Sequence, residues 1–517
     1  MNIKVLDCTL RDGGYVNNFA FGEKVAKQII IGLLKTNIEY VEVGFLRNTK
    51  AESETTVFTS TKETDALLPD TMKNVKIFAM IVFGKFDIDK LPPKSQTKID
   101  GIRVTFKKHE IDEALAYIKK IEEKGYIVSA NPTVVNSYTD SELLGLIEKV
   151  NLYQPNIFAI VDTLGVLKRN DMRRLFYLVN HNLSDKIAVA FHSHNNLQLS
   201  FSNAQALLET KCEREVIIDS SLRGMGRGAG NLCTELLLQY LNDNYDKQYN
   251  LLPVLKLIDE DINKIYTTNS WGYNVPYYLA AALECHPNYA LFLIDKAALC
   301  LESIEAILQS IPESKKSNYD EKLVQELYLK FQENEVDDTE ILAQLNQQIS
   351  HRPVLVLAPG KTIVSENTKI KEYINQKNPF VISINFKPQE FKVDNVFISN
   401  QRRYSEQNDY NDVIVTSNIK TEKCRKLNYG SYLNNSEMAD NSALMLIKIL
   451  LKLSVKQVTF AGLDGFTNGN DNYYLATMVN NAKLGWENDK RNTIMHDMLK
   501  RFAKQININF LTPSLYE

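Results

Sequence analysis

The sequence predicts an α/β protein in which a (β/α)8 barrel is followed by a helical segment and a second, smaller α/β domain. Three observations favour this architecture. Eight short apolar runs recur along residues 1–245, each is followed by a stretch of helical periodicity, and a new series of strand-like runs begins at Pro353. Strands that alternate with helices pair in parallel, and eight such units match the size of a closed barrel.

The eight predicted barrel strands are rich in apolar and β-branched residues and start roughly 25 to 40 residues apart. In chain order they are KVLDC (4–8), YVEVGF (40–45), KIFAMIVF (76–83), GIRVTF (101–106), IVSANPTVV (127–135), IFAIVDT (157–163), IAVAFHSH (187–194) and VIIDSS (216–221). A doubly wound sheet more often stops at five or six strands, whereas closure into a barrel removes both exposed edges.

After residue 235 the pattern becomes helical, and we expect four parts in the chain. They are a barrel domain at 1–245, a helical extension at 246–310, a helical linker at 311–350 and a C-terminal α/β domain at 351–517. The linker is rich in Glu, Gln and Lys, with apolar residues at helical spacing. The C-terminal domain has glycines after its predicted strands, as nucleotide-binding crevices do, but it contains neither G-x-G-x-x-G nor a Walker A motif.

Composition narrows the class of protein. The chain has 517 residues, of which 44% are hydrophobic and 24% charged, and its formal net charge of −3 creates no field that attracts nucleic acid. The N-terminus lacks a signal-peptide pattern, and the longest apolar stretch, 443–453, is too short to span a membrane. Six cysteines without a C-x-x-C pair support neither disulfides nor a thiolate zinc site. We expect a cytoplasmic protein with small-molecule partners, and the sequence leaves a homo-oligomer open.

Ionisable and polar side chains gather at the carboxyl ends of the predicted barrel strands, where barrel enzymes carry their reactive groups. They are Arg11 and Asp12 after the first strand, Glu42 in the second, Asp162 and Thr163 at the end of the sixth, and His192 and His194 at the end of the seventh.

Two of these residues have the spacing of a chelate. His192 and His194 lie two apart on a strand, so both side chains can point toward the barrel axis. Strand eight lies between strands seven and one, which lets Asp12 complete a site of two histidines and one carboxylate. Such a set suits Mn²⁺, Mg²⁺, Co²⁺, Fe²⁺ or Zn²⁺, and we favour Mn²⁺ or Mg²⁺. The alternative is that both histidines fill the barrel with hydrogen-bonded partners and that Asp12 caps the next helix.

A glycine-rich loop, SLRGMGRGAGN at 221–231, follows the eighth predicted strand. Gly226, Gly228 and Gly230 would let backbone amides approach a substrate carboxylate or phosphate, and a helix N-terminus nearby favours an anion. Asn231 is placed to reach the metal or to orient a ligand. The alternative is a tight turn that packs the last helix under the barrel. Cys233 has no obvious base beside it, which disfavours a nucleophilic role.

Three ordered motifs resemble the DRE-TIM metallolyase superfamily: LDCTLRDGGY at 6–15, FHSHNN at 191–196 and GMGRGAGN at 224–231. This family of TIM barrels includes 4-hydroxy-2-oxovalerate aldolases, hydroxymethylglutaryl-CoA (HMG-CoA) lyases and isopropylmalate synthases, and the first and third motifs are most similar to the aldolases. The resemblance covers about residues 1–300.

The resemblance implies a role for each matching residue. Asp12, His192 and His194 would bind the ion, Asn231 would contribute to the metal site, and Arg11 would steady the enolate oxygen. The resemblance also places three polar residues near the substrate: Glu42, Asp162 and Thr163. One position departs from the pattern, because the aldolases carry a histidine three residues after the metal aspartate and this chain has Tyr15 there. We take Tyr15, Glu42 or a residue of the helical segment that follows the barrel as candidates for proton transfer.

These features predict a divalent-metal-dependent aldolase that makes or cleaves a 4-hydroxy-2-oxo acid, through a pyruvate enolate and an aldehyde. A Claisen-type acyl-CoA synthase or lyase and a non-catalytic binding scaffold stay open as alternatives. The Tyr-rich segment 271–292, with Tyr273, Tyr277 and His286, either covers the site or is an ordinary packed helix. The C-terminal domain is similar to Rossmann-like sialyltransferase-type domains, which implies a nucleotide-sugar or glycan ligand and a role in surface polysaccharide biosynthesis. The alternative is an assembly or substrate-delivery module that carries out no chemistry.

Overall fold

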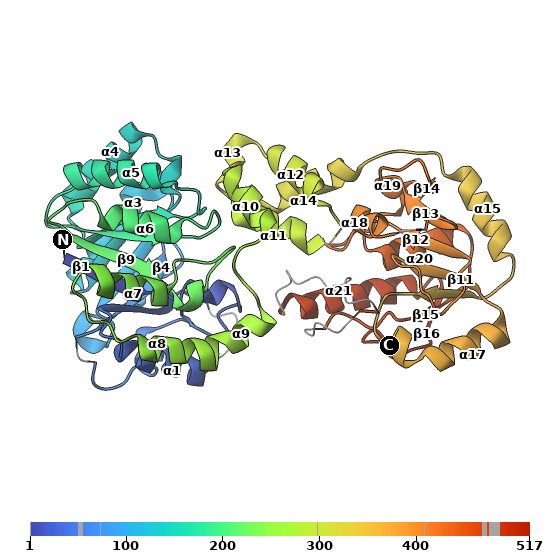
Figure 1. The fold of residues 1–517 in the computed structure, drawn as a ribbon, viewed down its shortest axis with the longest axis horizontal. Helices are drawn as coiled ribbons and strands as arrows, with labels where there is room; N and C mark the ends of the chain where they lie inside the picture. Colours follow the sequence, from blue (N-terminus) through green and yellow to red (C-terminus); the bar gives the residue numbers. More distant parts are fainter. Residues whose placement is uncertain are drawn as a thin grey trace. The chain divides into compact units, whose positions relative to one another are not determined.

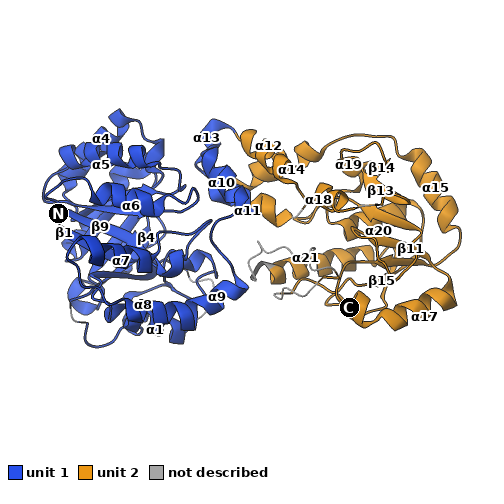
Figure 2. Ribbon diagram, in the orientation of Figure 1, with its two compact units in different colours: residues 1–291, 312–319 blue, residues 292–311, 320–517 orange. Residues whose placement is uncertain are grey.

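The computed structural model describes residues 2–49, 55–72, 74–296, 298–407, 409–467, 473–474 and 486–517. The chain divides into two compact units: unit 1 is residues 1–291 with 312–319, and unit 2 is residues 292–311 with 320–517 (Figure 2). The domain boundaries that we expected at residues 245, 310 and 350 stay predictions.

Unit 1 contains a closed barrel of eight parallel strands, as the sequence predicts. In chain order the strands are β1 (Asn2–Asp7), β2 (Tyr40–Leu46), β4 (Lys76–Val82), β5 (Gly101–Phe106), β6 (Ile127–Pro132), β7 (Ile157–Asp162), β8 (Ala188–Ser193) and β9 (Glu215–Ser220). Each pairs with the next around the barrel, and β1 pairs with both β9 and β2, which closes it. The short strand β3 (Val57–Phe58) is added beside β2.

Helices follow the strands and pack on the outside of the barrel (Figure 1). From residue 23 to residue 257 they are α1 (Glu23–Leu34), α2 (Thr61–Asp65), α3 (Ile111–Glu123), α4 (Asp140–Tyr153), α5 (Arg169–Asn182), α6 (Ser200–Leu208), α7 (Thr234–Asn244) and α8 (Leu251–Leu257). The chain then continues through α9 (Asn263–Thr268), α10 (Val275–Ala282), α11 (Pro287–Lys296), α12 (Leu301–Gln309) and α13 (Glu313–Lys316), of which α12 belongs to unit 2. Helix α4 shows why they begin where they do: Thr139 and Glu142 form a reciprocal capping box at its start.

Strand β8 illustrates how alternation places side chains inside the barrel. Val189 and Phe191 belong to the large core between strands and helices, whereas Ala188 and Ala190 belong to a separate apolar cluster contributed only by strands and strand ends. That second cluster is the barrel interior, because successive side chains of a strand point to opposite faces. The next inward position of β8 is therefore residue 192.

Unit 2 is built on an open sheet of seven parallel strands in the order β14–β13–β12–β11–β10–β15–β16. The strands are β10 (Val354–Leu357), β11 (Phe380–Ile384), β12 (Asn395–Ile398), β13 (Val413–Thr416), β14 (Arg425–Leu427), β15 (Gln457–Ala461) and β16 (Asn507–Phe510). The order reverses between β10 and β15, which is the pattern of a doubly wound α/β sheet. The second α/β domain predicted from the sequence is thus present.

The helices of unit 2 lie around this sheet, with α12 and the helix at 321–332 to one side of it (Figure 1). Besides α12 they are α14 (Glu321–Gln332), α15 (Thr339–Ile349), α16 (Thr362–Ser365), α17 (Asn367–Lys377), α18 (Gln401–Ser405), α19 (Tyr429–Tyr432), α20 (Ser442–Lys452) and α21 (Trp486–Phe502). The segment expected as a solvated linker is helical, but α15 also contributes Leu342, Leu345 and Ile349 to the core of unit 2. Within the described ranges, no helix is long and apolar enough to cross a membrane.

Candidate metal centre

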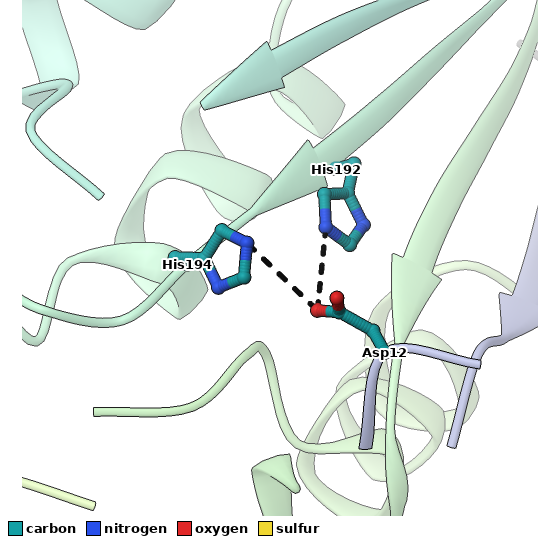
Figure 3. A group of neighbouring side chains, drawn as sticks. All are labelled: Asp12, His192 and His194. Carbon is teal, nitrogen blue, oxygen red and sulfur yellow. Dashed lines mark ion pairs between the residues drawn. The ribbon is translucent and has the colours of Figure 1, made fainter. Parts of the chain in front are cut away.

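Three side chains meet at the carboxyl ends of the barrel strands. His192 lies in β8, His194 follows this strand directly, and Asp12 lies in the loop after β1. The Nε2 atoms of His192 and His194 lie 3.6 and 3.8 Å from the same Asp12 oxygen, Oδ2, and all three side chains are buried (Figure 3). One ligand atom from each lies within 4.8 Å of the others. The structure therefore brings together the three residues that we expected to bind an ion.

The spacing of these atoms suits a cation better than direct hydrogen bonds. Ligand atoms at about 2.1 Å from one ion, in tetrahedral geometry, lie about 3.4 Å from each other. Nitrogen to oxygen separations of 3.6 and 3.8 Å exceed hydrogen-bond length but approach this value. Two imidazole nitrogens and a carboxylate oxygen form a donor set that fits a divalent ion of borderline softness.

A second carboxylate fixes the orientation of His192. The Nδ1 atom of His192 lies 3.0 Å from Oδ2 of Asp219, which is the next inward position of β9 after Ile217. An imidazole that donates Nδ1–H to a carboxylate presents the lone pair of Nε2, and this is the usual arrangement of a metal-binding histidine. The sequence did not lead us to Asp219, although a carboxylate inside the apolar run VIIDSS was a signal for it.

Arg103 connects Asp219 to the other side of the barrel. Its side chain is 2% exposed, projects from β5, pairs with Asp219 and donates from Nη1 to Oε2 of Glu42 at 3.2 Å. Arg103 was also missed at the sequence level, where its only signal was a charge inside GIRVTF. A buried guanidinium needs carboxylate partners, so Arg103 holds Glu42 and Asp219 in place.

Arg11 lies between two carboxylates. Its Nε donates to Oε2 of Glu42 at 2.7 Å, and its Nη1 donates to Oδ1 of Asp12 at 2.8 Å. Glu42 thus receives two guanidinium groups on one oxygen, while its Oε1 is buried and has no partner among the described residues. The structure therefore places Arg11 beside the Asp12 carboxylate and connects Glu42 to Asp12 through Arg11.

Asn231 also contacts Asp12. Its Nδ2 donates to Oδ2 of Asp12 at 2.6 Å and to the carbonyl of Met225 at 3.2 Å. Its Oδ1 is buried and has no partner among the residues that the structure describes. Residue 231 forms a backbone bridge with His194, which fixes the amide beside the group. An orphaned buried oxygen next to three candidate ligands is consistent with a fourth protein ligand.

The charges in the site prepare the ligands to bind a cation. Burial by itself would raise the pKa of Asp12, but Arg11, His194 and His192 together hold it well below its usual range. Burial, with the positive charges of His192, Arg227 and Arg11, lowers the pKa of His194 to about 3 against the opposing effect of Asp12. Asp12 is therefore ionised and His194 is neutral at neutral pH, as metal binding needs. His192 differs, because burial alone would lower its pKa but the carboxylates of Asp12 and Asp219 raise it, so an ion that binds there competes with a proton on this ring.

Two residues at the end of β7 hold loop backbone. The carboxylate of Asp162 accepts from the amides of Val166 at 3.0 Å and Leu167 at 3.1 Å. Oγ1 of Thr163 accepts from the amide of Val134 at 2.8 Å. Their expected contact with substrate stays a prediction, because these atoms already have partners within the protein.

The glycines after β9 allow close packing of the loop on the metal-binding residues. A Cβ on Gly226 would lie 2.5 Å from Nδ2 of Asn231, and one on Gly228 would lie 2.6 Å from Oδ1 of Asn196. Gly230, with φ +86°, would place a Cβ 2.1 Å from the carbonyl oxygen of Gly224. Ligand binding by these glycines stays a prediction. Burial, followed by the charge of Glu235, raises the pKa of Cys233 to about 12, which disfavours a nucleophilic thiolate.

Part of the Tyr-rich helical segment covers the glycine loop. Nε1 of Trp271 donates to the carbonyl of Arg223 at 3.0 Å, and Nε2 of His286 lies 3.4 Å from Nη1 of Arg227. Tyr273, in contrast, is 60% exposed. Tyr15, the candidate for proton transfer, lies nearby under the guanidinium of Arg227.

The N-terminal part of the chain is similar to several known proteins. Residues 2–259 match the model of the HMGL-like family. The chain is 27% identical over 246 residues to 4-hydroxy-2-oxovalerate aldolase of Thermomicrobium roseum, covering 46% of this chain and 66% of that protein. It is 25% identical over 238 residues to oxaloacetate decarboxylase of Mycobacterium tuberculosis, covering 46% and 69%. The N-terminal domain of a candidate aldolase from Bacteroides vulgatus has a TM-score of 0.49 at 27% identity, covering 58% of this chain and 98% of that one.

Proposed function

Because residues 2–259 form a domain of the HMGL-like family, we propose that this domain is a divalent-metal-dependent carbon–carbon lyase, an aldolase acting on a 4-hydroxy-2-oxo acid. The observation that carries the proposal is the buried group of Asp12, His192 and His194. The names of relatives, 4-hydroxy-2-oxovalerate aldolase and oxaloacetate decarboxylase, support a reaction that breaks a bond to C3 of a 2-oxo acid.

Asp12, His192 and His194, with Asn231, would hold the ion, and we favour Mn²⁺ or Mg²⁺. A divalent ion bound there withdraws charge from the 2-oxo group and stabilises the negative charge that develops when the C3–C4 bond breaks. Arg11 adds a second positive charge at the same place. The carboxylates of Asp12 and Glu42 orient its guanidinium through two hydrogen bonds, so no reorganisation is needed during the reaction.

Cleavage also requires the movement of a proton. A base removes the proton from the 4-hydroxyl, the C3–C4 electron pair moves to C3, and the aldehyde leaves. Oε2 of Glu42 already accepts from Arg11 and Arg103, so we assign Glu42 a positioning role toward Arg11. We assign the proton transfer to Tyr15, which lies in an aromatic cluster with Phe19 and Phe45.

The test follows the first chemical step with the simplest 2-oxo acid. Deuterium uptake into the methyl group of pyruvate is measured by NMR, with and without Mn²⁺, in the wild type and in Asp12→Asn. We expect exchange that needs Mn²⁺ and falls at least about 100-fold in Asp12→Asn, because enolate formation depends on the ion. Asp185→Asn is the matched control, since this carboxylate is fully exposed. An exchange rate that is the same with and without Mn²⁺, and the same in the wild type and Asp12→Asn, would contradict the proposal.

A role in surface polysaccharide biosynthesis belongs to the same proposal and depends on unit 2. Ligands of open parallel sheets bind where the strand order reverses, which here is between β10 and β15. The loops that follow these strands contact each other, with the amide of Gly360 donating to the carbonyl of Gly462 at 2.8 Å. A ligand of unit 2 would therefore bind at these loops, and titration of the full chain with nucleotide sugars tests whether it is a nucleotide sugar.

A further inference from the structure

Arg227 lies beside the candidate metal centre without taking part in it. It follows Gly226, which packs directly on the side chain of Asn231, and Asn231 donates to Asp12. The positive charge of Arg227 is also among the causes that lower the pKa of His194. Its guanidinium lies 3.9 Å from the centroid of the Tyr15 ring. The side chain is therefore at the mouth of the barrel, on the side where we place proton transfer.

Arg227 has different partners from the other two arginines of the site. Arg11 pairs with Asp12 and Glu42, and Arg103 pairs with Glu42 and Asp219. Arg227 forms no ion pair with any carboxylate in the described part of the chain, and its guanidinium interacts there with the Tyr15 ring and the imidazole of His286. A partly buried guanidinium without a counter-charge favours an anionic ligand.

His286 presents a second hydrogen-bond donor at the same point. It lies between α10 and α11, is 9% exposed, and its backbone amide is fixed by the carbonyl of Lys316 at 2.7 Å. Its Nδ1 accepts from the amide of Asn288 at 3.1 Å, and its Nε2 lies 3.4 Å from Nη1 of Arg227. Burial, and then the charges of Arg227 and His194, hold its pKa well below the ordinary value, so the ring is neutral.

A neutral imidazole cannot accept from both neighbours. It has one acceptor nitrogen and one N–H, yet both of its nitrogens face N–H donors. The backbone amide of Asn288 is fixed, whereas Arg227 has a flexible side chain. The tautomer that keeps the Asn288 hydrogen bond carries its proton on Nε2, so this N–H and the guanidinium face each other. Two donors that converge in this way are satisfied together by one acceptor oxygen.

We propose that Arg227 and His286 bind an anionic group, a carboxylate or a phosphate, on the aldehyde half of the substrate. This inference depends on the proposed aldolase function. The carboxylate of the 2-oxo acid half would lie beside the ion and Arg11, whose positive charges would neutralise it. Arg227 contacts Tyr15 instead, and Tyr15 must reach the oxygen on C4, so the group beside Arg227 lies beyond C4. The preferred partner of pyruvate is therefore an acidic aldehyde.

The test compares aldehydes that differ in charge. Aldol formation from pyruvate with Mn²⁺ is measured with acetaldehyde, glyoxylate and glyceraldehyde 3-phosphate, for the wild type, Arg227→Gln, Arg227→Lys and His286→Asn. We expect the wild type to have at least about tenfold higher kcat/KM for one anionic aldehyde than for acetaldehyde. Arg227→Gln should lower that value about 10- to 100-fold, the size of a lost charge-assisted hydrogen bond. His286→Asn should lower it less, and Arg227→Lys should restore part of it.

Two results decide against the inference. One is an equal loss of activity with charged and neutral aldehydes, or no wild-type preference for either anionic aldehyde. The other is a raised KM for pyruvate in the deuterium exchange of Arg227→Gln, which would place the guanidinium on the 2-oxo acid half. Arg173→Gln is the matched control, since Arg173 is a half-exposed arginine paired with Glu209. The same exchange separates the two proposals, because metal-dependent exchange without aldehyde preference would overturn only this one.

Discussion

The hydrogen-bond partners of its two ring nitrogens indicate whether His192 binds a metal or only fills the barrel. Nδ1 of His192 contacts Asp219 at 3.0 Å, while Nε2 faces Asp12 at 3.6 Å, beyond hydrogen-bond length. A barrel-filling histidine would have partners for both nitrogens at about 2.7 to 3.2 Å. The geometry thus favours an ion between His192 and Asp12, and makes Asp219 the residue that sets the tautomer.

The substitution Asp219→Asn tests this positioning role. Because the carboxylate fixes the ring and raises the basicity of Nε2, its loss should weaken Mn²⁺ binding about 10- to 100-fold. Calorimetric titration gives the affinity, and circular dichroism reports whether the fold is retained. Asp185→Asn removes an exposed carboxylate that pairs with Arg214, and should leave Mn²⁺ affinity unchanged. Wild-type affinity in a folded Asp219→Asn protein would show that the bond has no part in binding.

The three ligand positions could be predicted from the sequence, whereas the residues behind them could not. His192 and His194 share a face by strand alternation, and closure brings Asp12 to them, so two general rules suffice. Arg103 contacts Asp219 across 116 positions of sequence, and Glu42 across 61. No local pattern encodes such contacts. For the same reason the contact between Arg227 and His286 could not be predicted, although the segment that contains His286 was singled out, because this contact spans 59 positions of sequence.

At the scale of elements, the loop after β9 is shaped by what it packs against. Gly226 has no room for a Cβ because Asn231 lies beneath it, and Asn231 in turn contacts Asp12. A displacement of the loop would therefore also move the Asn231 amide that contacts Asp12.

Gly226→Ala should displace Asn231 and weaken Mn²⁺ binding about tenfold, with the barrel still folded. The matched control is Gly145→Ala in α4, where a Cβ would have nothing within 4 Å. That change should leave Mn²⁺ affinity as it is and raise the free energy of unfolding by about 0.5 to 1 kcal/mol, because alanine favours a helix over glycine. Titration and denaturant unfolding measure the two quantities. Equal affinities in the two variants would contradict the assigned packing.

The barrel strands were predictable because each is a short run buried on both faces. Helices followed from apolar periodicity, as in α3, where Ala114, Leu115, Ile118 and Ile121 are buried. The role of the segment 311–350 was harder to predict. Its periodicity indicates helices but does not show which surface these helices pack against. Tyr328 in α14, for example, is fully buried, and its hydroxyl donates a hydrogen bond to Asp440.

For the molecule as a whole, all candidate ligands lie in unit 1 and none in unit 2 among the described residues. Mn²⁺ should therefore stabilise one unit only. At a free concentration of 100 times Kd, the expected gain is about 2.7 kcal/mol in the free energy of unfolding of unit 1. Differential scanning calorimetry should resolve a transition that moves up with Mn²⁺ and another that stays in place. The shift should disappear in Asp12→Asn, and a uniform shift of both transitions would argue against a single site in the barrel.

Barrel closure has a consequence for how the protein is made. Strand β1 (Asn2–Asp7) pairs with β9 (Glu215–Ser220), so one edge of the first strand has no partner until the ninth leaves the ribosome. At translation rates of about 5 to 20 residues per second, that interval is about 10 to 40 s. During this time the nascent sheet has bare edges that invite pairing with other chains. The free edge of β1 is therefore exposed to such pairing for most of the synthesis of unit 1.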